Sequence, residues 1–294
     1  MHADHLSVQD QQPLRIVDHP TAQRFLAAAE PWLLQSEAEH NMLLGFATSM
    51  AGSNNPLPPD TLLAAVQQGD AIVGCISRIP PHKVGLTRLP IEAVPLVLEH
   101  VLALYESLPG VVGPDPVAYL FAKLWAERYG LQTRCTRHHR IYQLDRVIWP
   151  ERTPPGSMRL ATPDDLPLLR QWVHEFGEEV GLPDAGAPGI ADERLRNGWL
   201  FVWDDDGAKC MASLAGPTQN GIRVTHVYTP PASRGRGYAG ICTAALSQRA
   251  LDEGRRFTML YTDMNNPTSN AVYQRIGYVP VGDIFDWEFV AGIG

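Results

Sequence analysis

The chain has 294 residues, of which 45% are hydrophobic and 19% charged, a composition that predicts a folded protein of one large or two ordinary domains. Its formal net charge of −8 argues against a protein that binds the phosphate backbone of nucleic acids. The polar N-terminus lacks the apolar segment of a signal peptide, and no run approaches the roughly 18 apolar residues of a membrane span, so we expect a cytoplasmic protein without membrane segments.

The first half of the chain alternates helical and strand-like segments. Pro95 falls in the first turn of one expected helix and Pro116 directly precedes another, positions at which proline is tolerated. In chain order we expect a helical region over 21–45, a strand over 71–79, a helix over 91–107, a short strand over 111–113, a helix over 117–129 and a strand over 140–147.

The proline-rich stretch WPERTPPGS, residues 149–157, is the most linker-like part of the chain and divides it almost in half. After it, Thr162 and Pro163 favour the start of a helix at their position. The second half then predicts helices over 164–180, about 240–253 and 267–276, with strands over 199–203, 209–215, 222–229 and 257–262 and a final strand after 277. The first half shows a weaker version of this order. We therefore predict an α/β protein with two tandem domains, 1–150 and 151–294, each a mostly antiparallel mixed sheet flanked by helices.

Four cysteines stand singly, and no two have the C-x-x-C spacing of a zinc ribbon or a redox dithiol. They are Cys75, Cys135, Cys210 and Cys242. An isolated cysteine is typically a core residue, so we expect all four in the core and no metal site.

The stretch GRGYAG, Gly235 to Gly240, has the G-x-G-x-x-G form of a dinucleotide-binding loop, and Asp263 lies near the position of its acidic ribose ligand. Three observations argue against that interpretation. The five residues PPASR, two of them proline, separate the preceding strand from Gly235; only 54 residues follow Gly240; and antiparallel-looking strands precede the loop. A nicotinamide-dependent oxidoreductase is therefore a minor alternative.

The loop nevertheless has the properties of an anion site. Glycines let successive backbone N–H groups approach a phosphate, and the N-terminus of the following helix adds positive potential. Because Arg234 and Arg236 add charge, we expect a diphosphate as the ligand.

Two segments resemble the GCN5-related N-acetyltransferase family. VYTPPASRGRGYA is similar to its acetyl-CoA signature, an apolar strand and a proline before R/Q-x-x-G-x-G/A, here Arg234, Gly237 and Ala239. LYTDMNNPTSNAVYQRIGYVPVGD is similar to the family's last motif, in which Asn266 precedes a helix that carries Tyr273. Because Pro267 follows at the first helical position, Asn266 is also expected to cap this helix. The resemblance covers about 157–294. The first half resembles the partner domain of tandem members, because its segment FAKLWAERYGL is similar to AVYQRIGY. No R-G-x-G loop precedes that segment, so the resemblance implies a degenerate domain.

The resemblance implies acetyl-CoA as cosubstrate and assigns roles to particular residues. Backbone N–H groups of the loop would hold the pyrophosphate, strand residues would pair with the pantetheine amides, and two asparagines would contact the cofactor. Tyr273 is implied as the general acid, because a phenol with a pKa of about 10 stays protonated beside a departing thiolate. The implied cofactor-binding residues are Val227, Tyr228, Thr229, Arg234, Gly235, Arg236, Gly237, Tyr238, Ala239, Gly240, Asn266 and Asn270.

The general base stays open. Where some relatives carry a glutamate early in the cofactor strand, this region holds Arg223, which cannot accept a proton. His226 lies on the same strand but should face the opposite side of the sheet from Val227. An ordered water or a carboxylate between Glu175 and Glu179 is an equal alternative.

Residues 162–206 contain eleven acidic residues and three arginines, and they include the segment that in relatives lines the acceptor pocket, here Gly177 to Glu193. This pattern would suit a cationic amine, but a solvated helix face and turn is the favoured explanation. We predict an acetyl-CoA-dependent N-acetyltransferase for a small primary amine, without nucleic-acid, membrane or metal partners and with a homodimer allowed. The alternative is a non-catalytic acyl-CoA-binding or regulatory module.

Overall fold

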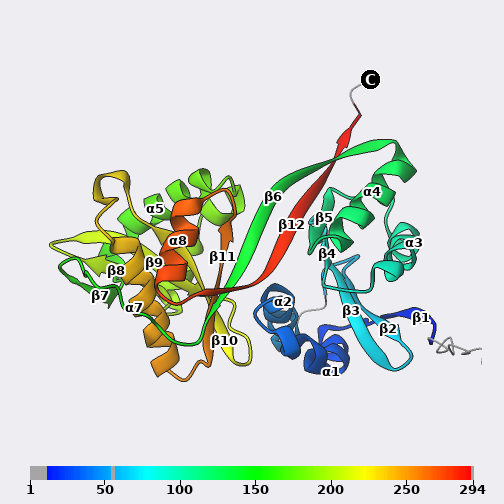
Figure 1. The fold of residues 1–294 in the computed structure, drawn as a ribbon, viewed down its shortest axis with the longest axis horizontal. Coiled ribbons are helices and arrows are strands. Elements are labelled where there is room, and N and C mark those ends of the chain that lie inside the picture. Colours follow the sequence, from blue (N-terminus) through cyan, green and yellow to red (C-terminus); the bar gives the residue numbers. More distant parts are fainter. Residues whose placement is uncertain (1–11, 54–56, 293–294) are drawn as a thin grey trace, which may run out of the picture. The chain divides into compact units, whose positions relative to one another are not determined.

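The computed structural model describes residues 12–53 and 57–292, and the chain divides into two compact units (Figure 1). The first unit contains the chain up to Gln35, the segment Ala47–His138 and the chain from Ile284 onward. The second unit contains Ser36–Phe46 and His139–Asp283. Each unit therefore includes residues from both halves of the sequence.

The first unit is a mixed sheet with helices packed on it. Its strands follow the order β1-β2-β3-β4-β5-β12. Strands β4 and β5 run parallel, and the other neighbouring strands run antiparallel. Its core joins the sheet to α3 and α4. The elements are β1 Leu14–Asp18, α1 Ala22–Leu33, β2 Leu62–Gln68, β3 Ala71–Arg78, β4 Val84–Leu86, α3 Val94–Leu104, β5 Gly110–Gly113 and α4 Val117–Tyr129, with short 3₁₀ turns at Leu34–Ser36 and Ile91–Ala93. Helix α2, Asn41–Gly52, has residues in both units.

The second unit repeats this arrangement with the strand order β7-β8-β9-β10-β11-β6. Strands β10 and β11 run parallel, and the other paired strands run antiparallel. One face of the sheet packs against α7 and α8, and the other packs against α5 and α6. The elements are β7 Ser157–Leu160, α5 Leu166–Glu179, α6 Ile190–Arg196, β8 Leu200–Asp204, β9 Ala208–Ala215, β10 Gly221–Tyr228, α7 Tyr238–Asp252, β11 Phe257–Asp263 and α8 Pro267–Arg275, with 3₁₀ turns at Pro163–Asp165, Pro183–Gly186 and Pro231–Ser233.

The last strand of each half ends in the sheet of the other unit. Strand β6, Leu131–Leu144, closes the first half and pairs with β11, with Leu144 opposite Thr258. Strand β12, Val279–Ala291, closes the second half and pairs with β5, with Phe285 opposite Gly113. Both long strands are visible in Figure 1, β6 in green and β12 in red. Neither exchange could be read from the order of elements along the sequence.

The predicted helices and strands correspond closely to the observed ones where the sequence pattern is strong. Helix α4 has the predicted bounds and ends at Gly130, whose φ of 64° is the left-handed conformation that glycine adopts most easily. The sequence pattern did not predict β1, β2, β4, β7, α6 or the first nine residues of β6. Strand β2, LLAAVQQ, is buried on both faces over its first five residues, so it lacks the alternation that marks a half-buried strand.

The expectation that all four cysteines lie in the core is correct for three of them. Cys75, Cys210 and Cys242 are buried, whereas Cys135 is exposed. Cys135 lies within QTRCTRHHR of β6, where polar neighbours on both sides leave the strand in contact with water. Among the described residues, every helix is too short or too polar to cross a lipid bilayer.

Candidate functional site

Strands β10 and β11 separate along their length. They pair over three positions, from Gly221 with Phe257 to Arg223 with Met259, and the recorded pairing stops there although both strands continue. On its other edge β10 carries a bulge, because Thr225 lies opposite Ser213 while Tyr228 lies opposite Met211. The described part of β10 beyond Arg223 therefore presents backbone groups that no neighbouring strand on the β11 side satisfies. A ligand with amide groups can pair with them.

The bulge also exchanges the faces of the side chains that follow it. Ile222 and Val224 face α7, and Val227 does so too, although strict alternation would turn it away. His226 adopts a φ of 49° and packs its ring against Phe176 of α5, with ring centroids 5.1 Å apart. His226 and Val227 thus lie on opposite faces, as the sequence predicted.

The loop from Gly235 to Gly240 has the geometry of a phosphate cradle. Gly235 and Gly237 have φ angles of 75° and 87°, and a Cβ at Gly235 would meet open space. Helix α7 begins at Tyr238, and its first backbone bond runs from the N–H of Ile241 to the carbonyl of Gly237. Among the described residues no backbone N–H between Gly235 and Gly240 has a protein acceptor. Such a run at a helix N-terminus fits an anion such as a diphosphate.

Two glutamates of α5 hold the segment between β10 and this loop. Glu175 accepts a hydrogen bond of 2.7 Å from the hydroxyl of Tyr228. Glu179, one turn later, lies 2.5 Å from Nη2 of Arg234, whose Nε donates to the carbonyl of Thr229 at 2.8 Å. Burial, followed by the bond to Glu175, raises the pKa of Tyr228 to about 12. Arg234 therefore shapes the loop through its contacts with α5 and β10.

The side chains of several predicted cofactor-binding residues have structural partners. The Tyr238 ring is buried against the sheet and its hydroxyl donates to Asp205, so any cofactor contact of Tyr238 comes from its backbone. Asn266 caps α8 by accepting from the N–H of Ser269 at 3.0 Å, as predicted from the following proline. Asn270 accepts from the hydroxyl of Tyr142 at 2.9 Å and donates to the carbonyls of Asp263 and Asn266.

Three further predicted residues have side chains with different surroundings. Arg236 is exposed and Ala239 half-buried, and both belong to the loop. Thr229 carries a buried hydroxyl oxygen for which the described residues provide no partner. A ligand along the end of β10 could therefore accept a hydrogen bond from Thr229.

Tyr273 lies on α8 with its ring against Tyr278, at a centroid distance of 6.1 Å and an interplanar angle of 68°. Among the described residues its hydroxyl has no hydrogen-bond partner. Burial raises the pKa of Tyr273 well above its ordinary value, with smaller contributions from Tyr278 and Cys210. The phenol is therefore protonated at neutral pH and its donor is available.

Residues 217–283 match the family model described as FR47-like protein, a range that contains β10, the glycine loop, α7, β11 and α8. Among solved structures, an N-acetyltransferase related to GCN5 from Sphaerobacter thermophilus is 14% identical with a TM-score of 0.58, over 96% of this chain and 98% of that one. The chain has the fold of the GCN5-related N-acetyltransferases. The family resemblance and the mixed α/β class predicted from the sequence are thus confirmed.

Two further solved structures share this GCN5-related N-acetyltransferase fold. An acetyltransferase from Colwellia psychrerythraea is 14% identical with a TM-score of 0.55, over 94% of this chain and 99% of that one. A tandem protein of the family from the clavulanic acid biosynthesis pathway is 16% identical with a TM-score of 0.50, over 96% of this chain and 100% of that one. The tandem arrangement is therefore also found in this fold. No curated protein sequence matches the chain.

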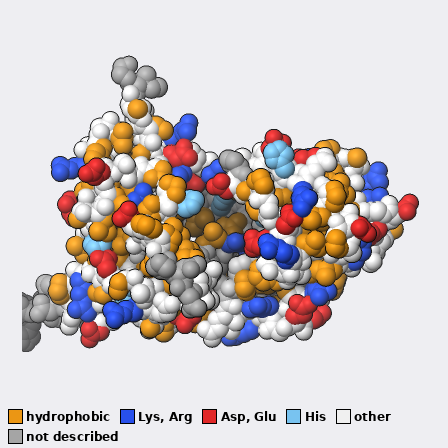
Figure 2. Space-filling model, turned by 180° about the vertical axis from the view of Figure 1, so that it is seen from behind, with side chains coloured by type: hydrophobic (Ala, Val, Ile, Leu, Met, Phe, Trp, Pro, Cys, Tyr) orange, Lys and Arg blue, Asp and Glu red, His pale blue; other side chains and the backbone are white. Residues whose placement is uncertain are grey.

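Five of the eleven acidic residues in 162–206 pair with arginines, and two more accept from tyrosine hydroxyls. Asp165 receives hydrogen bonds of 2.7 and 2.9 Å from Arg159, and Asp192 is bound by Arg170 across α5 and α6. Figure 2 shows positive and negative side chains interspersed over the visible face. Most of the carboxylates that suggested a cationic acceptor thus have a guanidinium or hydroxyl partner within the chain.

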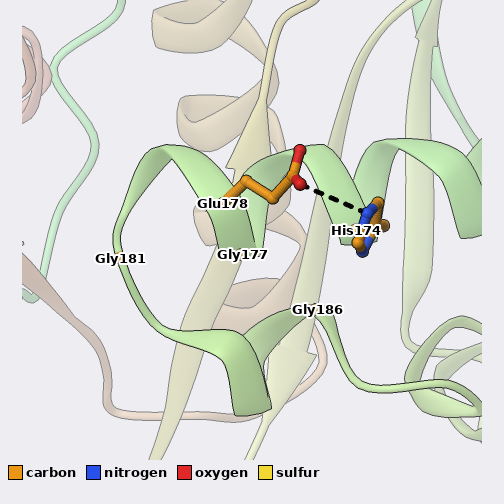
Figure 3. Close-up of a pocket in the computed structure, with 5 residues that line it drawn as sticks. All are labelled: His174, Gly177, Glu178, Gly181 and Gly186. Atoms are coloured by element: carbon orange, nitrogen blue, oxygen red, sulfur yellow. Dashed lines mark ion pairs between the residues drawn. The ribbon is translucent and has the colours of Figure 1, made fainter.

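A cavity of about 340 Å³ lies between the end of α5 and the turn that follows it (Figure 3). Its lining residues are His174, Gly177, Glu178, Gly181 and Gly186, with His174 and Glu178 3.5 Å apart. A Cβ on Gly177 would lie 2.5 Å from the backbone nitrogen of Gly186, so the close approach of helix and turn requires glycine there. None of the predicted cofactor-binding residues lines this cavity.

Two residues of the first half make contacts in the second unit that the sequence did not predict. Tyr142 of β6 is buried in the core of α7 and α8 and also binds Asn270. Glu37 accepts bonds of 2.7 Å from both the backbone and the side-chain nitrogen of Asn220, in the turn before β10. Neither contact has a local sequence signal, because its partner lies more than a hundred residues away.

Proposed function

We propose that this protein is an acetyl-CoA-dependent N-acetyltransferase for a small primary amine, with its working site in the second half of the chain. The observation that supports this proposal most directly is the unpaired run of backbone N–H groups at Gly235–Gly240 beside the open edge of β10. The loop suits a diphosphate, and the open edge of β10 suits a chain of amides. Coenzyme A contains both of these groups.

Each residue has a role that its geometry allows. The loop N–H groups hold the diphosphate, and the backbone of Val227 to Thr229 pairs with the pantetheine arm. A backbone N–H of this strand polarises the thioester carbonyl, in the manner of an oxyanion hole. Acetyl-CoA supplies the activated acetyl group, and the Tyr273 hydroxyl, as the general acid, donates to the departing sulfur. Because the pKa of the phenol lies above the value of about 8.5 of a thiol, Tyr273 stays protonated and its hydrogen bond stabilises the negative charge that develops on the sulfur.

No general base is assigned among the candidates. Glu175 and Glu179 bind Tyr228 and Arg234, and the ring of His226 packs between Phe176 and Ser213. The alternative of a non-catalytic acyl-CoA-binding module rests on this lack of an assigned general base.

The test of the cofactor site is calorimetric titration of the full chain with acetyl-CoA, and with NADH as the control. We expect one site per chain with micromolar affinity for acetyl-CoA and no saturable binding of NADH. Two sites would show that the first half also binds the cofactor. NADH binding without acetyl-CoA binding would refute the proposal. Acceptors are then found by measuring release of free thiol from acetyl-CoA with a panel of primary amines.

A further inference from the structure

Arg223 carries a positive charge on the face of the second unit's sheet opposite α7. Its neighbours Ile222 and Val224 pack against α7, so the side chain of Arg223 extends to the other face. There its Nη1 donates to Oδ1 of Asn41 at 3.1 Å and contacts the sulfur of Met42, and the guanidinium lies 5.9 Å from the ring centre of Tyr261. Every one of these partners is neutral.

The described residues give Arg223 no carboxylate. Glu37, from the same segment as Asn41, is bound to the turn at Asn220, and Glu39 packs against Gly282 near Tyr261. A second guanidinium, of Arg194, repels that of Arg223, although Nη1 of Arg194 is itself paired with Glu193 at 3.0 Å and its buried Nε has no hydrogen-bond partner among the described residues. Burial is the main cause that lowers the pKa of Arg223; Tyr261 opposes it and the repulsion by Arg194 adds to it, although arginine stays charged at any physiological pH.

A guanidinium in such surroundings destabilises the free protein unless something negative binds to it. Desolvation of an unpaired charge is unfavourable, and a neutral residue of similar volume would avoid it. Arg223 is also partly exposed, so a small ligand can reach it. The fixed fork of a guanidinium suits the two oxygens of a carboxylate or phosphate.

Arg223 also lies at a useful distance from the proposed acetyl-transfer site. It is the last residue of β10 that pairs with β11, and the open edge of β10 begins immediately after it. Val227, the first residue proposed to pair with the pantetheine arm, lies four positions after Arg223, which at about 3.3 Å per residue is roughly 10 Å once the bulge is allowed for. One small molecule can therefore present an amine to the cofactor and an anionic group to Arg223.

We infer that Arg223 binds an anionic group, a carboxylate or a phosphate, on the amine acceptor, and that Asn41 positions its guanidinium. This inference rests on the proposed function. Asn41 is suited to the role because its Oδ1 accepts from Arg223 while its Nδ2 donates to the carbonyl of Ala38 at 2.7 Å and to the Tyr261 hydroxyl at 2.6 Å. The first half of the chain thus supplies a residue that sets acceptor specificity.

The test is calorimetric titration with matched pairs of amines in the presence of saturating CoA, which binds without turnover. The carboxylate pairs are glycine with methylamine, β-alanine with ethylamine and γ-aminobutyrate with propylamine; the phosphate pair is phosphoethanolamine with ethanolamine. We expect the anionic member of at least one pair to bind at least tenfold more tightly, and the pair concerned identifies carboxylate or phosphate. Equal binding within every pair, or no binding of any probe, would overturn the inference.

Three variants locate the effect. Arg223→Met removes the charge and should abolish the preference, whereas Arg223→Lys should retain part of it. Asn41→Ala removes the oxygen that accepts from Arg223, so it should reduce the preference. Arg15→Met, which removes an exposed arginine of the first unit, is the matched control and should change nothing. A preference that survives in Arg223→Met would overturn the inference.

A thermal melt distinguishes a binding residue from a structural one. Because it removes an uncompensated charge, Arg223→Met should raise the Tm by about 2–4 °C. A fall of the Tm in this variant would show that the guanidinium stabilises the fold, and the inference would be wrong. Acetyl-CoA affinity should stay unchanged in Arg223→Met, whereas a wild-type protein that does not bind acetyl-CoA would refute the proposed function instead.

Discussion

Glu179 and Arg234 join the end of α5 to the glycine loop, with Oε1 of Glu179 2.5 Å from Nη2 of Arg234. Both side chains are about half exposed, so their charge attraction is screened by water. The second bond of Arg234, to the carbonyl of Thr229, fixes the path of the chain between β10 and the loop. The arginine of the loop therefore orders the N–H groups as well as adding charge.

Replacement of Arg234 should weaken acetyl-CoA binding through this ordering. We expect Arg234→Met to raise the calorimetric Kd roughly tenfold, equivalent to about 1.4 kcal/mol, because the loop must then be ordered on binding. Glu179→Gln should change the Kd less than about threefold, since an exposed ion pair contributes about 0–1 kcal/mol. Arg249→Met, which breaks an exposed pair with Glu253 further along α7, is the control. A larger effect for Glu179→Gln than for Arg234→Met would contradict this account.

Gly237 should be required for its backbone conformation. At a φ of 87°, Gly237→Ala should lower stability by about 1–2 kcal/mol and weaken acetyl-CoA binding as the loop shifts. Gly207→Ala is the matched control for Gly237→Ala. Gly207 has a φ of 98° and open space at its Cβ position, and a Cβ at Gly237 would meet only Pro154, at 3.9 Å. Urea unfolding should show a similar loss of stability for both, and titration should show weaker acetyl-CoA binding for Gly237→Ala alone.

Tyr273→Phe should separate catalysis from binding. Loss of the proton donor should lower kcat by roughly 10²-fold and leave the Kd for acetyl-CoA unchanged. The ring contact with Tyr278 persists in the variant, so the fold should be retained, which circular dichroism can check. Unchanged turnover on a found acceptor would show that Tyr273 is not the general acid.

Stability should depend on pH through Glu37. Burial alone would raise the pKa of Glu37, but hydrogen bonds from Thr218, Asn220 and Gly221 outweigh it and lower the pKa. A carboxylate whose folded-state pKa is depressed stabilises the fold above its unfolded pKa of about 4.3, and this stabilisation disappears as the pH falls through the folded value. We expect Glu37→Gln to lower the free energy of unfolding by about 1–3 kcal/mol at pH 7, with the difference shrinking below about pH 4.

The matched control for Glu37 is Glu127→Gln, which removes an exposed carboxylate of α4. Its unfolding free energy should follow that of the wild type at every pH. If the loss in Glu37→Gln were independent of pH, the ionised carboxylate would not be the group that holds the turn before β10.

The sequence by itself determined the helix cap and the glycine loop, which depend on interactions between residues close together in the chain. Pro267 after Asn266 predicted the cap of α8, the glycine spacing predicted the loop before α7, and the two motifs predicted the family fold. These features depend on residues within one turn or one loop, so the residue types alone are sufficient. The sequence predicted that His226 and Val227 lie on opposite faces of β10, as observed, but it did not predict the bulge between Thr225 and Tyr228.

The tertiary structure decided what depends on residues far apart in the chain. Strand β6 pairs with β11, and the segment from Ser36 to Phe46 packs in the second unit, because their side chains complete its core and bind its turns. Arg223 looked from the sequence like the replacement of a base, and only the packing revealed that Asn41 and Tyr261 surround it without a carboxylate. The sequence gives the number of charged residues. Which partner each charged side chain has depends on the fold, because the fold brings distant residues together.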